Sequence, residues 1–157
     1  MYNARPAAKL AARHGVCDTP AMETLLIGCS DGRIARRLDA LLDEFGQPYA
    51  NRMLVPGGVL PLTRPGSERR VALACVREIV EAHGVRQIVL VAHQECAAYA
   101  RALGGMGFDQ QELLERDVRR VKTLLETEFA GVDVRCYVIP WREDGEGAAF
   151  APAVAVD

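Results

Sequence analysis

Apolar runs of strand length alternate with amphipathic, helix-like segments along this chain. The clearest apolar runs cover residues 25–28 and 88–92, and neither contains a charged side chain. Between them, residues 34–45 place apolar side chains on one helical face, and Gly46 follows as an end signal. Strands that alternate with helices form βαβ units, in which helices cover the faces of a parallel sheet. We therefore predict an α/β fold.

The predicted architecture is a single domain over residues 1–157, with a central, mainly parallel four-stranded sheet flanked by helices. The strands are expected at residues 24–29, 52–55, 87–92 and 134–139, with an extra edge strand near residues 150–156. Helices are expected at residues 3–14, 34–45, 69–83 and 110–129. The helix over residues 69–83 is expected to bury Val71, Ala74, Cys75, Ile79 and Val80. Numbered along the chain, the strands take the order 2-1-3-4, so the winding direction reverses beside the first strand.

Composition excludes several classes of protein. Half of the 157 residues are hydrophobic, which suffices for one domain with a real core. A net charge of −2 and scattered arginines give no basic face, so we expect no nucleic-acid partner. The first residues lack the apolar stretch of a signal peptide, and no segment is long enough to span a membrane. We therefore expect a cytoplasmic protein with no membrane partner. The five cysteines are an odd count in a chain too large to need a disulfide framework.

Two polar clusters directly follow predicted strands. Residues 29–33 (CSDGR) follow the first strand, and residues 93–96 (HQEC) follow the third. In the order 2-1-3-4, Cys29, His93 and Cys96 meet beyond the carboxyl ends of neighbouring strands, where ligands collect in such sheets. Two thiolates and one imidazole suit zinc, and three protein ligands leave a fourth position open, as in catalytic sites. The sequence therefore predicts a catalytic metal site with an aspartate and an arginine beside it.

Each of these residues also has a structural interpretation. A cysteine at a strand end is commonly a small buried side chain, and we interpret Cys75 and Cys136 in that way. Asp31 could cap the helix that follows it, which would leave Arg33 an ordinary surface charge. Glu95 lies between two candidate ligands and is expected to point outward.

The two clusters together resemble the pattern of the beta-class carbonic anhydrases, Cys-x-Asp-x-Arg followed by His-x-x-Cys. The resemblance covers roughly nine-tenths of the chain. It implies that Cys29, His93 and Cys96 bind one zinc ion per chain. It also implies reversible hydration of carbon dioxide to bicarbonate by a zinc-bound hydroxide. Asp31 would orient this hydroxide, and Arg33 would hold Asp31 away from the metal.

Some positions depart from the family pattern. Gly32 stands where the family usually has serine, and residues 54–58 (LVPGG) replace an arginine–asparagine–alanine–glycine–asparagine run. No glutamine occurs at residues 16–22, where one normally helps to form the substrate pocket. We expect backbone groups of Gly57 and Gly58 to line the substrate-binding pocket instead.

These departures keep rival functions open. A less polar pocket could favour hydrolysis of carbonyl sulfide or carbon disulfide on the same scaffold. A zinc-binding relative could also lack catalysis altogether. A further rival is a thiol enzyme, with Cys29 as the nucleophile and His93 as its base.

The resemblance further implies a homodimer or a dimer of dimers. In the family, the active site lies at a subunit interface and the first helix packs across the partner. In this chain, Ala8, Leu10, Ala11 and Ala12 give the helix over residues 3–14 an apolar side. A lone domain would leave that side partly exposed, so we expect it to pack on the partner subunit.

Overall fold

The molecule is built around a five-stranded sheet in the order β2-β1-β3-β4-β7. The computed structural model describes residues 23–104, 110–144 and 147–157. The strands of this sheet are β1 (Thr24–Cys29), β2 (Asn51–Val55), β3 (Gln87–His93), β4 (Asp133–Ile139) and β7 (Val154–Val156). The first four pair in parallel, and β7 pairs antiparallel with β4. The predicted α/β class, the order 2-1-3-4 and the extra edge strand are confirmed.

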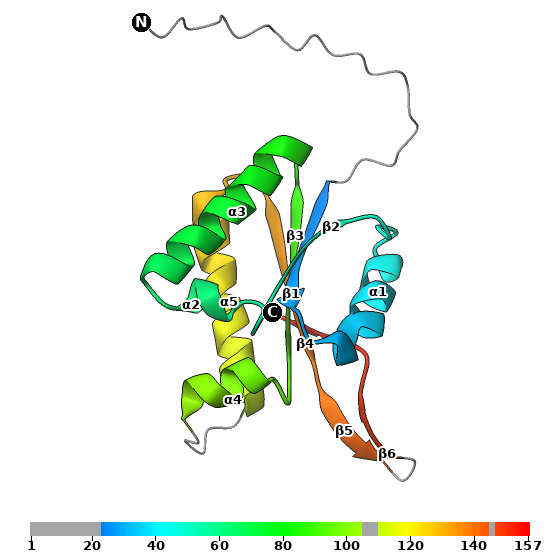
Figure 1. The fold of residues 1–157 in the computed structure, drawn as a ribbon. Helices are drawn as coiled ribbons and strands as arrows, with labels where there is room; N and C mark the ends of the chain where they lie inside the picture. The colour runs from blue at the N-terminus through cyan, green and yellow to red at the C-terminus, as the bar shows by residue number, and fades with distance from the viewer. Residues whose placement is uncertain (1–22, 105–109, 145–146) are drawn as a thin grey trace, which may run out of the picture.

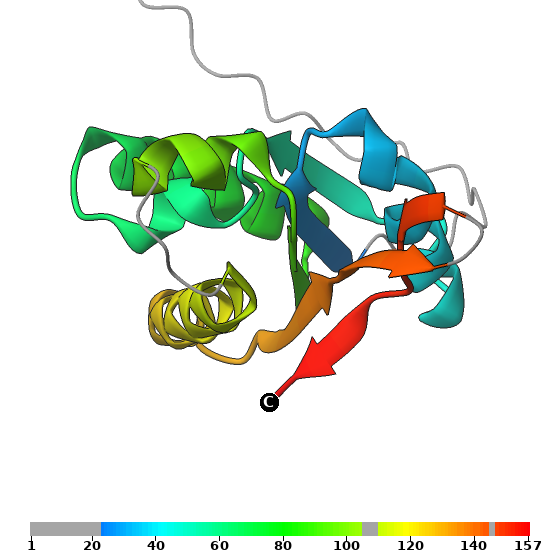
Figure 2. The ribbon, with the colours of Figure 1, turned by 90° about the horizontal axis from the view of Figure 1, so that it is seen from below.

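Helices cover both faces of this sheet. They are α1 (Ala35–Glu44), α2 (Leu60–Thr63), α3 (Ser67–His83), α4 (Ala97–Leu103) and α5 (Gln110–Glu128). A 3-10 turn, η1 (Gly32–Ile34), leads into α1. Figures 1 and 2 show α1 on one face and α3, α4 and α5 on the other. The winding direction therefore reverses at β1 and β3, which is where ligands collect in open parallel sheets.

The core lies at the two central strands of the parallel part. All side chains of β1 are buried, and β3 is buried from Ile88 to its end at His93. Strands covered by helices on both faces need apolar side chains at successive positions, not only at alternate ones. This explains why both strands stand out in the sequence as continuous apolar runs.

The apolar stripe of α3 differs from the predicted one. Ala72 and Val76 are buried, and Ile79 and Val80 are partly buried against the core. Val71 is 64% exposed, and Ala74 and Cys75 are also exposed. The buried positions follow the spacing i, i+4, i+7 and i+8 from residue 72, whereas residue 71 lies about 100° further round the helix. The predicted burial of Val71, Ala74 and Cys75 is therefore wrong.

A hairpin extends beyond the end of β4. Its strands are β5 (Trp141–Asp144) and β6 (Gly147–Phe150), which pair antiparallel with Trp141 opposite Phe150. The backbone N–H of Trp141 donates to Oε1 of Gln94, with N and O 2.6 Å apart. The second strand of the hairpin runs back toward the end of β3, and its last residue, Phe150, packs against His93 there. The sequence analysis expected only a single edge strand in this region.

The predicted helix over residues 3–14 and its apolar side lie outside the described residues. Its packing on a partner subunit therefore stays a prediction. Among the helices that the structure describes, none combines the length and the hydropathy that a membrane span requires.

Candidate metal centre

The candidate ligands come from the ends of two adjacent strands. Cys29 is the last residue of β1, His93 is the last residue of β3, and Cys96 precedes the first residue of α4. Strands β1 and β3 are neighbours that pair in parallel, so their carboxyl ends lie side by side. A turn of two residues after β3 then places Cys96 beside the other two ligands. The structure brings together all three residues that the sequence predicts as metal ligands.

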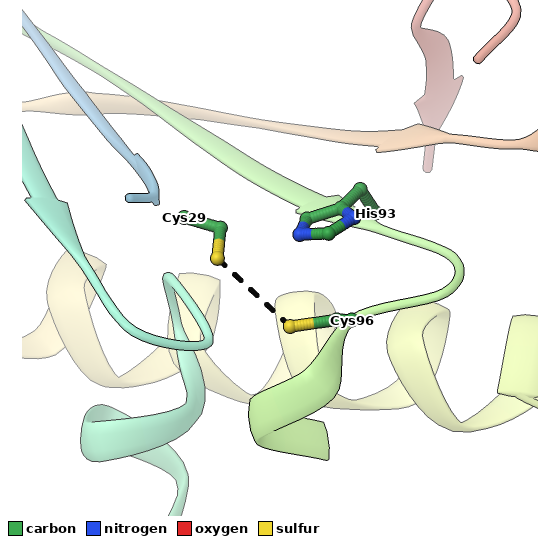
Figure 3. Close-up of side chains that lie close together, drawn as sticks. All are labelled: Cys29, His93 and Cys96. Carbon is green, nitrogen blue, oxygen red and sulfur yellow. Dashed lines mark hydrogen bonds between the residues drawn. The ribbon is translucent and has the colours of Figure 1, made fainter. Parts of the chain in front are cut away.

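These three side chains form a compact, buried cluster. One ligand atom from each of Cys29, His93 and Cys96 lies within 4.8 Å of the others. The two sulfur atoms are 3.9 Å apart. Figure 3 shows the imidazole ring and the two sulfurs converging on one space. The cluster could hold a metal ion.

The imidazole of His93 has one ring nitrogen without a partner. Nδ1 lies 2.7 Å from the carbonyl oxygen of Gln94, so this nitrogen carries the proton and donates it. Nε2 is buried and makes no hydrogen bond, in a side chain that is only 1% exposed. A buried polar atom without a partner costs about 1–3 kcal/mol. A metal ion bound at Nε2 would remove this cost, and a backbone carbonyl on the other nitrogen is the usual support of a metal-binding histidine.

The two thiols differ in their tendency to ionise. A hydrogen bond from the Cys96 thiol lowers the pKa of Cys29, and the backbone N–H of Gly57 also donates to its sulfur, with N and S 3.3 Å apart. The same hydrogen bond with Cys29, together with burial, raises the pKa of Cys96. The ionisation of one thiol therefore depends on the other. A soft divalent cation could bind both sulfurs at once, so the donor set fits such an ion.

The loop after β2 approaches the end of β1 very closely. Gly57 and Gly58 have φ angles of +79° and +59°, which L side chains rarely adopt. A Cβ atom on Gly58 would lie 3.0 Å from the backbone nitrogen of Cys29. Glycine is therefore needed here for the loop to bring the Gly57 N–H onto the Cys29 sulfur. The sequence analysis missed this contact, and the predicted substrate-binding role of both glycines stays a prediction.

Asp31 and Arg33 form an ion pair beside the cluster. The guanidinium of Arg33 contacts both carboxylate oxygens of Asp31, the shortest N–O distance being 2.6 Å. The backbone N–H of Arg33 also donates to Oδ1 of Asp31, so this side chain caps the 3-10 turn as well. Asp31 therefore caps the turn and pairs with Arg33 at the same time, and its role in orienting a hydroxide stays a prediction. Hydrogen bonds from Arg33 lower the pKa of Asp31 to about 2.

Two further contacts hold the Arg33 guanidinium. It donates to the carbonyl oxygen of Glu95 over 3.0 Å, and it lies over the ring of Phe150, 5.4 Å from the ring centroid. Glu95 itself is exposed, as expected, and has a φ of +56° that turns its carbonyl toward the arginine side of the loop. Arg33 is thus not an ordinary surface charge.

Phe150 is the residue near the centre that the sequence analysis did not identify. Its ring packs edge-on against His93, with centroids 5.4 Å apart, and against Trp141, with centroids 4.8 Å apart. Its carbonyl oxygen also accepts a hydrogen bond from Arg37. Nothing in the spacing of the two clusters indicates this contact, because Phe150 comes from a hairpin far along the chain.

Comparisons with known proteins bear on the fold. No protein-family model matches the chain, and no curated protein matches it. Among solved structures, a carbonic anhydrase from Glaciozyma antarctica matches with 15% identity and a TM-score of 0.54, over 91% of this chain and 86% of that one. A carbonic anhydrase from Streptococcus mutans matches with 14% identity and a TM-score of 0.54, over 88% and 83%. Tetrameric beta-carbonic anhydrases from Sordaria macrospora match with 16% identity and a TM-score of 0.50, over 76% of each chain.

This chain has the fold of the beta-carbonic anhydrases. At such low identity, the likeness shows the fold alone. It agrees with the resemblance of the two sequence clusters, which rests on different observations. The fold places those clusters at one edge of the sheet, and the chemistry has to be argued from the residues themselves.

Proposed function

We propose that this protein is a zinc-dependent carbonic anhydrase that interconverts carbon dioxide and bicarbonate. The observation that carries the proposal is the buried cluster of Cys29, His93 and Cys96, with an unpartnered Nε2 and an ionised aspartate beside it. The fold agrees with this assignment, since the matching solved structures are carbonic anhydrases.

The donor set favours zinc over other common ions. Two cysteine sulfurs and one histidine nitrogen are typical zinc ligands, whereas magnesium and calcium prefer oxygen. We expect one zinc ion per chain, with the fourth position left for water or substrate. When bound, zinc lowers the pKa of a coordinated water and so supplies hydroxide near neutral pH.

Asp31 and Arg33 would then act as one unit. The carboxylate of Asp31 stays ionised at any ordinary pH, because Arg33 lowers its pKa to about 2. It can accept a hydrogen bond and so fix the direction from which the nucleophile approaches carbon dioxide. Arg33 would hold this carboxylate away from the ligand cluster, and the Glu95 carbonyl and the Phe150 ring contact the Arg33 guanidinium.

A second candidate function has a specific observation in its favour. The loop of residues 54–58 offers no polar side chain, and its backbone lies against the end of β1. An apolar pocket wall suits a less polar substrate, such as carbonyl sulfide or carbon disulfide. A zinc-binding relative without catalysis is the remaining alternative on this scaffold.

Parallel assays on one zinc-loaded preparation separate these functions. Carbon dioxide hydration and carbonyl sulfide hydrolysis are measured, each before and after zinc removal by a chelator. We expect hydration that is lost with zinc and restored by its return. Hydrolysis of the sulfur compound alone would favour the second candidate, and no activity at full zinc loading would favour the non-catalytic one. Activity that survives chelation but not alkylation would favour a thiol enzyme.

We also propose that the protein assembles as a homodimer or a dimer of dimers. An apolar groove of about 400 Å³ lies between the edge strand β2 and α3. It is lined by Met53, Val55, Pro61, Ser67, Glu68, Val71, Ala72 and Cys75. Within the described residues, β2 pairs only with β1, so its other edge is open. An open strand edge beside exposed apolar side chains fits a second copy of the chain.

Val71→Asp tests this assembly, because a charge in the groove would oppose burial against a partner. We expect sedimentation to show monomers at concentrations where the wild type is a dimer or larger. Val154→Asp is the matched control, since Val154 is also exposed but lies on the opposite edge strand, β7. A stable wild-type monomer would contradict the proposal, as would dissociation caused by Val154→Asp alone.

A further inference from the structure

The turn that joins His93 to Cys96 contains a residue in an unfavourable backbone conformation. Glu95 has a φ of +56°, and it is the one non-glycine residue with a positive φ in the part of the chain that the structure describes. A Cβ atom makes this left-handed conformation costly, so it persists only where surrounding contacts hold it. The contacts that hold Glu95 therefore bear on the geometry of the ligand cluster.

The peptide unit between Gln94 and Glu95 is hydrogen-bonded at both of its polar groups. Its N–H, from Glu95, donates to Oε1 of Gln110, with N and O 2.7 Å apart. Its carbonyl oxygen, from Gln94, accepts a hydrogen bond from Nδ1 of His93, also over 2.7 Å. A trans peptide unit is planar, so the direction of its N–H fixes the direction of its carbonyl. Gln110, the first residue of α5, is thus linked to the imidazole of His93 through one rigid group.

The residues on either side of this peptide unit are anchored separately. The side-chain oxygen of Gln94 accepts a hydrogen bond from the backbone N–H of Trp141, and the carbonyl oxygen of Glu95 accepts one from Arg33. These contacts fix the two ends of the unit but not its rotation between them. Two common types of tight turn differ by just such a rotation of the central peptide. The rotation would bring φ of Glu95 to the ordinary negative range and turn the Gln94 carbonyl away from His93.

We propose that Gln110 is a positioning residue for the candidate metal centre. By holding the N–H of Glu95, it opposes this rotation and keeps a carbonyl acceptor on Nδ1 of His93, which leaves Nε2 for a metal ion. The hydrogen bond to Gln110 also polarises the peptide unit and so strengthens its carbonyl as an acceptor. A strong acceptor on the second nitrogen makes a histidine a better metal ligand. The inference rests on the zinc site proposed above only where it concerns zinc affinity.

Zinc affinity, measured by competition with a chelating dye, tests the acceptor on Gln110. Gln110→Leu keeps a side chain of similar size without the oxygen, and we expect the affinity to fall by about tenfold. Gln110→Glu keeps an oxygen acceptor and should stay within about twofold of the wild type. Gln111→Leu is the matched control one position along α5, because the Gln111 amide donates to Glu115. An unchanged affinity in Gln110→Leu, or an equal loss in the control or in Gln110→Glu, would overturn the proposal.

The Nδ1 proton of His93 gives a readout that depends on neither zinc nor activity. Its exchange with solvent can be followed by NMR on the full chain, with and without zinc, and only three histidines need to be assigned. We expect slow exchange in the wild type and exchange at least about tenfold faster in Gln110→Leu. Equal exchange in both proteins would overturn the positioning role. A wild type that binds no zinc would instead contradict the proposed function, and the exchange of this proton would still decide the present inference.

A second substitution tests whether rotation of the peptide unit is the cause. Glycine adopts a positive φ without cost, so adding Glu95→Gly to Gln110→Leu should restore zinc affinity by about threefold or more. Glu95→Gly alone should change the affinity by less than about twofold. Glu95→Gln is the matched control, because it removes the same charge but keeps the Cβ atom, and it should restore nothing. If Glu95→Gly changes the affinity by the same factor in the wild type and in Gln110→Leu, the two residues act independently and the proposal is overturned.

Discussion

Among the described residues, two aspartate–arginine ion pairs have the same spacing, and one of the two lies beside the candidate metal site. Asp31 and Arg33 follow the carboxyl end of β1, whereas Asp133 and Arg135 lie at the amino end of β4. The two pairs are therefore at opposite ends of the parallel strands. In both pairs, the arginine lowers the pKa of the aspartate. The Asp31 side chain is 19% exposed and the Asp133 side chain is 56% exposed.

The surroundings distinguish the two pairs more than their own geometry does. Each arginine lies over an aromatic ring, Arg135 over Phe45 and Arg33 over Phe150. The ring of Phe150, however, packs against His93, and Asp31 lies two residues after a candidate ligand. Asp133 and Arg135 have no candidate metal ligand near them among the described residues. An ion pair at the surface contributes little by itself. The comparison therefore teaches that only the first pair lies beside the candidate ligands, at the carboxyl ends of β1 and β3, and its proposed role rests on that position.

The largest expected effect comes from removing one ligand of the metal that we propose for the first region. Cys96→Ala leaves two protein ligands, which rarely hold zinc against water. We expect zinc affinity to fall by more than about 100-fold, and hydration activity to disappear with it. Metal analysis of the purified variant measures this. Stoichiometric zinc in Cys96→Ala would contradict the ligand assignment.

Cys136→Ala provides the matched control for that loss. Cys136 is a second buried thiol, and its sulfur contacts the carbonyl oxygen of Val118 rather than the cluster. The variant should lose some stability, by about 1–2 kcal/mol, but keep its zinc. Loss of zinc from both variants would indicate general destabilisation instead of ligand loss.

The next effect comes from breaking each ion pair in turn, at matched zinc content. Asp31→Ala should keep zinc but lose activity by about 100-fold, because the nucleophile loses its orienting acceptor. Arg33→Ala should also lose activity, since an unrestrained Asp31 can occupy the open coordination position. Combining the two changes should add little further loss, as expected for residues that act as one unit. Stopped-flow carbon dioxide hydration measures all four proteins.

Asp133→Ala and Arg135→Ala are the controls that the second pair offers. They remove the same charges at the same spacing, away from the cluster. Both should keep the wild-type rate. If these two variants reduce the hydration rate as much as Asp31→Ala does, the rate depends on overall charge and not on the position of the first pair. That result would contradict the comparison.

A smaller effect is expected at Phe150, which links the first pair to the histidine. Phe150→Leu keeps an apolar side chain but removes the ring contacts with His93, Trp141 and the Arg33 guanidinium. We expect a loss of about 1–2 kcal/mol in the free energy of unfolding, and a modest loss of hydration rate with zinc retained. Chemical denaturation and the same hydration assay measure both. A variant with unchanged stability and rate would show that Phe150 does not position Arg33.

The smallest effect is expected at Cys75. The structure places this thiol on the exposed side of α3, although the sequence pattern indicated burial. Cys75→Ala should change the unfolding free energy of the monomer by less than about 0.5 kcal/mol and leave zinc content unchanged. A large loss of monomer stability would mean that Cys75 is buried within the monomer, contrary to its exposed position on α3.

The sequence predicts the fold and the ligand cluster well because both depend on short-range signals. Continuous apolar runs mark β1 and β3, and parallel pairing then brings residue 29 to residues 93 and 96. Which side of α3 packs on the core could not be predicted in the same way. A shift of one residue rotates a helix by about 100°, and only packing on the sheet decides which side is buried. The contact between Phe150 and His93 depends on a hairpin that returns the chain over a long distance in sequence.

Contacts of backbone groups and buried atoms without a hydrogen-bond partner also could not be predicted from the sequence. The turn of Pro56, Gly57 and Gly58 was visible as a pattern, but the hydrogen bond from Gly57 N–H to the Cys29 sulfur was not. The unpartnered Nε2 of His93 depends on which groups surround it in three dimensions. Such atoms carry information about ligands that no residue spacing contains.

The most direct test of the central claim is a zinc titration of the metal-free protein, followed by stopped-flow hydration of carbon dioxide. We predict that the rate rises in proportion to added zinc and levels off at about one zinc per chain. Asp31→Ala, titrated in parallel, should bind the same amount of zinc and stay near the uncatalysed rate. A wild-type protein that binds one zinc per chain and hydrates carbon dioxide no faster than buffer would contradict the proposed function.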